Sequence, residues 1–191
     1  LYYKTMKGLS DAAFDTLLKQ RIAASERYSQ KHRKLLSDIC NARNIPLASH
    51  DDANLDHVRE SLACGVRLAE FPTSLEAARA SHQAGLSVLM GAPNIVRGSS
   101  HSGNIAAIDL AKLGVLDVLS SDYVPFSIIH APFILAEGGI NLPDAIAMVT
   151  ATPARAVGLE DRGRIAAGLR ADLVRVRQNG GVPVVRSVWR Q

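Results

Sequence analysis

A repeated alternation of short apolar runs with helix-like segments constrains this chain more than any other feature of its sequence. It occurs four times between residues 44 and 125. The apolar runs IPLASHDD, VRLAEF, SVLMGAP and VLDVLSSDYVP are typical of buried parallel strands, and the segments between them have apolar residues at helical spacing. Because parallel neighbours need crossover connections, the pattern predicts an α/β fold with a parallel sheet.

The remaining segments complete the predicted order of elements. Residues 10–43 have the spacing of one long helix or a pair of helices, opened by the cap-like Ser10 and Asp11. Residues 142–159 predict one amphipathic helix, and the turn sequence QNGG at 178–181 predicts a closing two-stranded hairpin. The helices predicted within the repeat cover residues 54–65, 74–85 and 104–114, and residues 94–103 are predicted to form a loop.

The placement of polar side chains distinguishes a barrel from a doubly wound sheet. Each predicted strand is followed by reactive side chains at its carboxyl end, which is the edge that carries the chemistry of a (β/α)₈ barrel. No GxGxxG or GxxxxGK[ST] loop follows a strand, and this weighs against a nucleotide-binding doubly wound sheet. The strand-end residues are His50, Asp51, Asp52, Glu70, Asn94, Arg97 and Asp122.

The charge distribution argues against a nucleic-acid partner. The formal net charge is +4, and the basic excess is confined to residues 151–191, which hold eight Arg against three acidic residues. Aromatic residues make up 5% of the chain and do not interleave with those arginines, so no base-stacking groove is expected.

The same sequence predicts a cytoplasmic protein that makes no membrane contact. No apolar run approaches the roughly 18 residues that a bilayer span needs, and the amino-terminal segment lacks a signal-peptide core. Cys40 and Cys64 have no CxxC partner, so we expect two buried thiols in a reducing compartment.

The segment TATPARAVGLEDRGRIAAGLRADLVRV, residues 150–176, resembles the carboxyl-terminal signature of the amidohydrolase superfamily. In that superfamily the last barrel helix carries TxxPA, and an xGxIxxGxxADLV stretch returns the chain to a small β-sandwich. The resemblance implies that residues 1–158 belong to a metal-dependent TIM-barrel hydrolase domain and residues 159–191 to the β-sandwich. It also places the four strands at positions five to eight of the barrel, so that this chain corresponds to the C-terminal half.

A narrower resemblance concerns the substrate. The strings ASHDD, AEFPTS, MGAPNIVRGSSHSGN and LSSDYVP are similar to the phosphonate-metabolism members of the superfamily, which serve the carbon–phosphorus lyase pathway. The resemblance implies a diphosphatase that cleaves the 5-triphosphate of a ribose methylphosphonate to the 5-phosphate and diphosphate. The implied partner is therefore a small anionic phosphorylated sugar, and the implied cofactor is a divalent metal ion of the Zn or Mn/Mg type.

The resemblance assigns roles to individual residues. His50, Glu70 and Asp122 are the predicted metal ligands, with Glu70 standing where most of the superfamily has a histidine. Asp122 and His101 are the predicted catalytic residues, Asp122 as acceptor of a proton from water. The loop after the third strand, with Arg97 as a bidentate fork beside a helix start, suits phosphate oxygens. Its predicted substrate-binding residues are Asn94, Arg97, Ser99, Ser100, Ser102 and Asn104.

The roles of Glu70 and His101 have alternatives. Glu70 is either a ligand or a carboxylate that orients another group, and His101 is a ligand, a leaving-group acid or a phosphate donor. The remaining histidines are given no site role, and His57 and His82 are expected to be solvated on helices.

Two rival functions remain open. One is an amidohydrolase that acts on a cyclic amide such as a dihydropyrimidine or a hydantoin, although the phosphate-suited loop argues against it. The other is a half-barrel that is inactive alone, because no HxH motif occurs in this chain and Leu1 is interpreted as a cut ahead of the fifth strand. Such a half would pair with the missing N-terminal half or with another copy of itself.

Overall fold

The computed structural model describes residues 6–100 and 103–191 as two compact units. The first, Leu1–Ile45, consists mainly of the helix α2, Asp11–Ala42, whose start is capped where the Ser10 hydroxyl accepts a hydrogen bond from the Ala13 N–H at 3.3 Å. A single helix therefore forms where one or two were predicted. None of the described helices is both long and apolar enough to cross a membrane.

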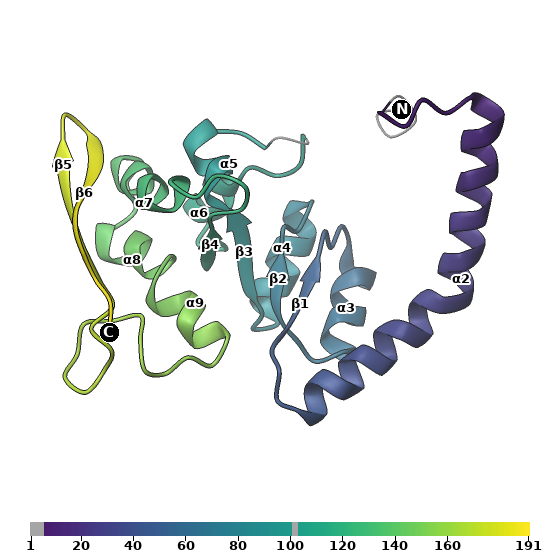
Figure 1. The fold of residues 1–191 in the computed structure, drawn as a ribbon, viewed down its shortest axis with the longest axis horizontal. Helices are drawn as coiled ribbons and strands as arrows, with labels where there is room; N and C mark the ends of the chain where they lie inside the picture. Colours follow the sequence, from purple (N-terminus) through teal and green to yellow (C-terminus); the bar gives the residue numbers. More distant parts are fainter. Residues whose placement is uncertain (1–5, 101–102) are drawn as a thin grey trace. The chain divides into compact units, whose positions relative to one another are not determined.

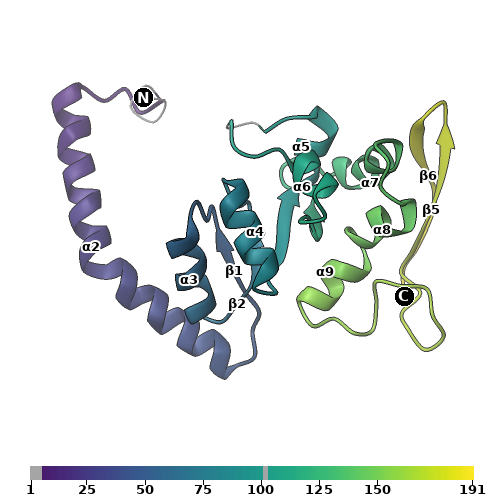
Figure 2. The same ribbon diagram turned by 180° about the vertical axis from the view of Figure 1, so that it is seen from behind.

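The second unit, Pro46–Gln191, is built on a four-stranded parallel sheet (Figures 1 and 2). The strands follow one another in chain order, and this confirms the predicted parallel α/β alternation. Right-handed crossovers in such an order place successive helices on the same face, and α3 packs beside α4. The strands are β1 Leu47–His50, β2 Val66–Glu70, β3 Ser87–Gly91 and β4 Val118–Ser120, with α3 Leu55–Ala63, α4 Leu75–Gln83 and α6 Ala107–Lys112 between them.

A short helix occupies part of the segment that was predicted as a loop. Helix α5, Ala92–Arg97, starts directly after β3 because Pro93 suits the first helical turn, and it ends at Gly98, whose φ of 79° permits the left-handed cap. This corrects the loop assignment for residues 94–97 and fixes the end of the helix at Arg97.

A helix absent from the sequence prediction completes the core. Helix α7, Ser127–Glu137, is apolar on nearly all sides, so it lacked the polar face that identifies an amphipathic helix. Ala131 and Leu135 are buried in the same cluster as Val88 of β3 and Leu119 of β4. The main core therefore lies around β3, β4 and the helices α5–α8.

The predicted helix 142–159 is interrupted. It forms α8, Leu142–Ala147, and α9, Ala151–Ala156, because Pro153 has no N–H to offer and its ring clashes with the carbonyl four residues earlier. The interruption leaves the Met148 carbonyl available to accept a hydrogen bond from the Leu119 N–H at 2.9 Å, at the outer edge of β4.

The closing hairpin forms as predicted. Strands β5, Leu173–Asn179, and β6, Val182–Trp189, pair antiparallel, and the connecting Gly180 and Gly181 both have positive φ, as a tight two-residue turn requires. In both views the hairpin lies beside α7, and β6 contacts that helix (Figures 1 and 2).

The segment before the hairpin carries two exposed acids with lowered pKa values. A hydrogen bond from Arg162 holds the pKa of Asp161 below its usual value, and the Gln191 backbone N–H does the same for the pKa of Asp172. Neither Cys40 nor Cys64 forms a disulfide, and both are half-buried rather than buried as predicted.

Candidate active site

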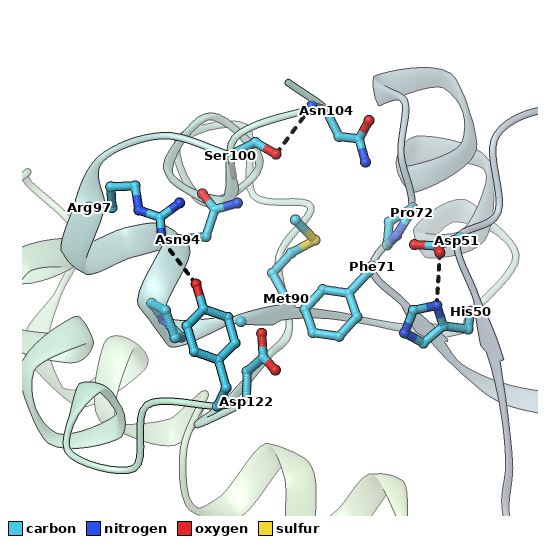
Figure 3. A pocket seen from close by; sticks show the side chains of 13 residues that line it. His50, Asp51, Phe71, Pro72, Met90, Asn94, Arg97, Ser100, Asn104 and Asp122 are labelled. Carbon is cyan, nitrogen blue, oxygen red and sulfur yellow. Dashed lines mark hydrogen bonds and ion pairs between the residues drawn. The ribbon is translucent and has the colours of Figure 1, made fainter. Parts of the chain in front are cut away.

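A pocket of about 340 Å³ lies at the carboxyl ends of the parallel strands (Figure 3). Its lining comes from the ends of β1 and β3, from residues just beyond β1, β2 and β4, and from α5 and the segment that follows, as expected for chemistry located at this edge of a parallel sheet. The lining residues are His50, Asp51, Phe71, Pro72, Met90, Gly91, Pro93, Asn94, Arg97, Ser100, Asn104, Asp122 and Tyr123.

Three of the lining residues adopt a left-handed backbone conformation just beyond a strand. Asp51, Phe71 and Asp122 have φ values of 62°, 53° and 47°. The backbone hydrogen bonds of the sheet continue into two of these residues. The Asp51 N–H donates to the Glu70 carbonyl at 3.0 Å, and the Phe71 N–H donates to the Leu89 carbonyl at 2.9 Å. Left-handed non-glycine residues cluster at functional sites, so their position around one pocket supports a functional role for it.

His50 lies at one side of the pocket. Its Nδ1 is 3.1 Å from Asp51 Oδ2, and its ring meets the Phe71 ring edge-on at 5.3 Å between centroids. Asp51 is therefore the acid that contacts His50.

Asp52 has a different role, because its side chain is buried. Its carboxylate accepts hydrogen bonds from the Ser49 hydroxyl at 2.6 Å and the Ser61 hydroxyl at 3.2 Å, and its carbonyl accepts one from Thr73 N–H at 2.9 Å. Asp52 thus anchors the turn that carries His50 and Asp51.

The ring of Phe71 lies between His50 and Asp122 (Figure 3). A Cβ atom placed on Gly91 would lie 3.3 Å from Phe71 Cε1 and 3.4 Å from Asp122 Oδ2. The glycine therefore makes room for the close approach of the ring and the carboxylate.

The residues that the structure describes do not fit a complete metal site. No group of three or more His, Cys, Asp or Glu side chains comes together among them, and Glu70 is not part of the pocket lining. His50 and Asp122 alone supply fewer protein ligands than the three or four that a zinc ion ordinarily has, and Phe71 lies between them (Figure 3).

The wall of the pocket that lies across from His50 and Asp51 presents hydrogen-bond donors (Figure 3). Arg97 Nη2 donates to the Tyr123 hydroxyl at 2.9 Å. Asn94 Oδ1 accepts from Ala107 N–H at 3.0 Å, and this bond leaves the Asn94 NH₂ group for the pocket, because an amide nitrogen cannot accept. The Ala107 N–H at the start of α6 therefore donates to a side chain of the protein and does not face a ligand.

The described part of the 94–104 segment is also internally bonded. The Ser100 hydroxyl accepts a hydrogen bond from Asn104 N–H at 3.1 Å, and both residues line the pocket. Ser99 does not line it, and His101 and Ser102 lie outside the described residues.

The pocket brings six of the predicted site residues together: His50, Asn94, Arg97, Ser100, Asn104 and Asp122. Sequence reasoning gave no role to Phe71, Gly91 and Tyr123. The one available signal in the sequence was Gly91 at the end of an apolar strand, because a glycine there often marks a place where another group approaches the backbone closely.

Comparison with known proteins assigns the family. The sequence profile of the amidohydrolase family matches residues 37–181. The chain belongs to this family. It is 49% identical over 193 aligned residues to the alpha-D-ribose 1-methylphosphonate 5-triphosphate diphosphatase of Escherichia coli K12, a match that covers all of this chain and 51% of the relative. The chain thus spans about half the length of that curated relative.

Solved structures with low sequence identity share the fold. An amidohydrolase from Thermotoga maritima MSB8 superposes with a TM-score of 0.62 at 19% identity, over 97% of this chain and 57% of that protein. Molinate hydrolase superposes with a TM-score of 0.58 at 17% identity, over 81% of this chain and 43% of its own. These likenesses confirm an amidohydrolase-type α/β fold.

Proposed function

We propose that this chain is the C-terminal half of a hydrolase that cleaves a phosphoanhydride bond in an anionic sugar triphosphate. The substrate of this proposal is alpha-D-ribose 1-methylphosphonate 5-triphosphate, and the products are the 5-phosphate and diphosphate. The likeness to the E. coli diphosphatase supports this substrate. In the same proposal β1–β4 are barrel strands five to eight, residues 1–158 belong to the barrel and residues 159–191 to the β-sandwich.

The observation that carries the proposal is that a carboxylate and hydrogen-bond donors line one and the same pocket. Asp122, Arg97 and Asn94 lie on the same side of the Phe71 ring (Figure 3), and the Asn94 NH₂ group is not used by the bond to Ala107. A carboxylate that accepts a proton from water and a guanidinium that binds phosphate oxygens are the two groups that hydrolysis of a phosphoanhydride needs.

In the proposed reaction the water oxygen forms a bond to the α-phosphorus while the bond from that phosphorus to the α–β bridging oxygen breaks. Asp122 accepts a proton from the attacking water, and the leaving diphosphate takes the electron pair of the broken bond. Arg97 and Asn94 donate hydrogen bonds to the phosphate oxygens on which negative charge increases.

Amidohydrolases generally depend on a metal ion, and His50, Glu70 and Asp122 are the metal ligands that the sequence resemblance suggests. The divalent ion stays a prediction for the complete protein, because the described residues do not form its site. The steps above are therefore assigned to side chains of this chain alone.

The test is diphosphate release from a 5-triphosphorylated ribose by the purified full-length protein, followed by ³¹P NMR. We expect Asp122→Asn to lower kcat by about 10²-fold or more, because it removes the proton acceptor. Arg97→Ala is expected to raise KM by roughly tenfold, because a charge-assisted contact is lost. Asp56→Ala, which alters an exposed acid on α3 outside the pocket, serves as the control.

Two outcomes would count against the proposal. One is turnover of a dihydropyrimidine or a hydantoin with no diphosphate release from the triphosphate, which would favour the cyclic-amide reaction. The other is undiminished diphosphate release by the Asp122→Asn variant. The 191-residue chain alone is expected to show no appreciable turnover.

A further inference from the structure

Tyr123 is a pocket residue to which neither the sequence nor the family relation gives a role. It follows Asp122 directly, and its hydroxyl accepts a hydrogen bond from Arg97 Nη2 at 2.9 Å. The two side chains come from separate parts of the fold, since Arg97 ends α5 and Tyr123 follows β4, and both line the pocket.

The chemistry of this contact suits an anion site. Arg97 is the only Arg or Lys among the described residues that line the pocket, and it is exposed. A free arginine side chain loses up to about 2 kcal/mol of rotamer entropy when a ligand fixes it. The hydroxyl bond holds the guanidinium in place beforehand. Because a hydroxyl is neutral, the positive charge of Arg97 stays available to a ligand.

The tyrosine also keeps a donor of its own. Its oxygen accepts from Arg97, so its O–H hydrogen is not used in that bond and is able to donate to a second acceptor. A phosphate oxygen beside Arg97 would therefore receive hydrogen bonds from a guanidinium and from a phenol.

The backbone links this pair directly to Asp122. Asp122 has a φ of 47°, and this left-handed turn brings the consecutive side chains of Asp122 and Tyr123 to the same pocket. Tyr123 is thus one peptide away from the residue proposed to accept the proton of water.

We propose that Tyr123 and Arg97 form one anion-binding unit for a di- or triphosphate, in which Tyr123 is the positioning residue that holds the guanidinium at the pocket. This inference rests on the proposed function for the identity of the anion. Beyond the proposed function, it identifies Tyr123 as a residue that raises the affinity for phosphate by holding Arg97 in place.

The test is binding of inorganic diphosphate to the full-length protein by isothermal titration calorimetry. Tyr123→Phe keeps the ring and removes only the hydroxyl, and we expect it to weaken diphosphate binding about tenfold, the size of one hydrogen bond to a charged group. In an Arg97→Ala background the same change is expected to have a clearly smaller effect, because the part that acts through the guanidinium is gone and only the direct hydrogen bond from the hydroxyl is lost.

A matched control is available in Tyr28→Phe. Tyr28 lies on α2, where it stacks on His32, and it does not line the pocket. This variant is expected to bind diphosphate with unchanged affinity. Thermal unfolding of each variant checks that the fold is retained.

A kinetic readout separates positioning from a structural role. Tyr123→Phe is expected to raise KM about tenfold with kcat changed by less than about twofold, since the hydroxyl acts on binding rather than on the proton transfer. A fall in kcat with unchanged KM would contradict the inference.

The outcomes also separate this inference from the proposed function. If the protein binds diphosphate with the predicted coupling of Tyr123 and Arg97 but hydrolyses no triphosphate, the proposed function fails and the anion-binding unit stands. If it hydrolyses the triphosphate but Tyr123→Phe leaves diphosphate affinity unchanged, or weakens it equally with and without Arg97, the anion-binding unit is refuted. Absence of diphosphate binding by the unsubstituted protein refutes it as well.

Discussion

Asp51, Phe71 and Asp122 each adopt a backbone conformation that costs a non-glycine residue roughly 1–2 kcal/mol. The surrounding structure outweighs this cost, for example through the buried Asp52 carboxylate, which fixes the turn next to Asp51. The left-handed turns place three side chains, each just beyond a different strand, in the lining of one pocket. Backbone strain is thus concentrated just beyond the strand ends, around this pocket.

Gly91 provides a direct test of the close approach at the centre of the pocket. Its φ of −74° suits alanine, so Gly91→Ala is not expected to strain the backbone. The added methyl would lie 3.3 Å from Phe71 and 3.4 Å from Asp122 Oδ2. The ring must shift by a few tenths of an ångström beside Asp122, whose Oδ2 would be in van der Waals contact with the new methyl, and we expect kcat of the full-length protein to fall by roughly tenfold.

The measurement is kcat for diphosphate release, with the thermal unfolding midpoint as the check on folding. A variant with unchanged stability and reduced kcat supports the assignment of the Asp122 position. Unchanged kcat would show that the spacing of Phe71 and Asp122 does not matter for the reaction.

At the scale of elements, Asp117 joins three parts of the fold at the end of the sheet opposite the pocket. Its Oδ2 accepts a hydrogen bond from the buried Val88 N–H of β3 at 2.8 Å and lies 3.1 Å from Nδ1 of His82 on α4. His82 is therefore half-buried and paired, which corrects the expectation that it is solvated. The contact fixes the start of β4 against β3 and α4.

Asp117→Ala is expected to destabilise the protein by about 2 kcal/mol, because the Val88 N–H would be left buried without an acceptor. The matched control is Asp56→Ala, which removes an exposed acid paired with Arg59 and is expected to cost less than about 1 kcal/mol. Urea denaturation of both variants measures the difference. Equal midpoints for the two would contradict the role given to Asp117.

For the whole molecule, the two outer edges of the sheet differ in how they are covered. At β4 the Met148 carbonyl accepts the Leu119 N–H, whereas β1 pairs only with β2 among the described strands. An edge strand with free backbone groups is a site for pairing with another chain or another segment. We therefore expect the 191-residue chain to associate through β1.

Ala48→Lys tests this expectation. Ala48 is an exposed residue of β1, and a lysine on an edge strand opposes strand pairing. Sedimentation velocity of the 191-residue chain over a range of concentrations is expected to show weaker association for this variant. Ala63→Lys, which adds the same charge on an exposed position of α3, is expected to leave association unchanged. Equal association of the two variants would locate the contact elsewhere.

Several elements could be predicted from the sequence because their causes are local. The apolar runs around Leu47, Leu68 and Val88 identified parallel strands, and the paired glycines after Asn179 identified the hairpin turn. Helix α7 escaped prediction because it is apolar on nearly all sides. The break between α8 and α9 was also missed, although Pro153 marked its place, because the periodicity of the two halves is continuous.

The sequence by itself determined the parallel α/β alternation, the family and the set of polar residues at the strand ends, because period, turn chemistry and motif are properties of neighbouring residues. Only the tertiary structure decided which of those residues share a pocket. It directed Asp51 to His50 and Asp52 into a serine-lined site, and it brought Tyr123 to Arg97 from 26 residues away. These contacts depend on backbone angles and strand register, which the identities of single residues do not reveal.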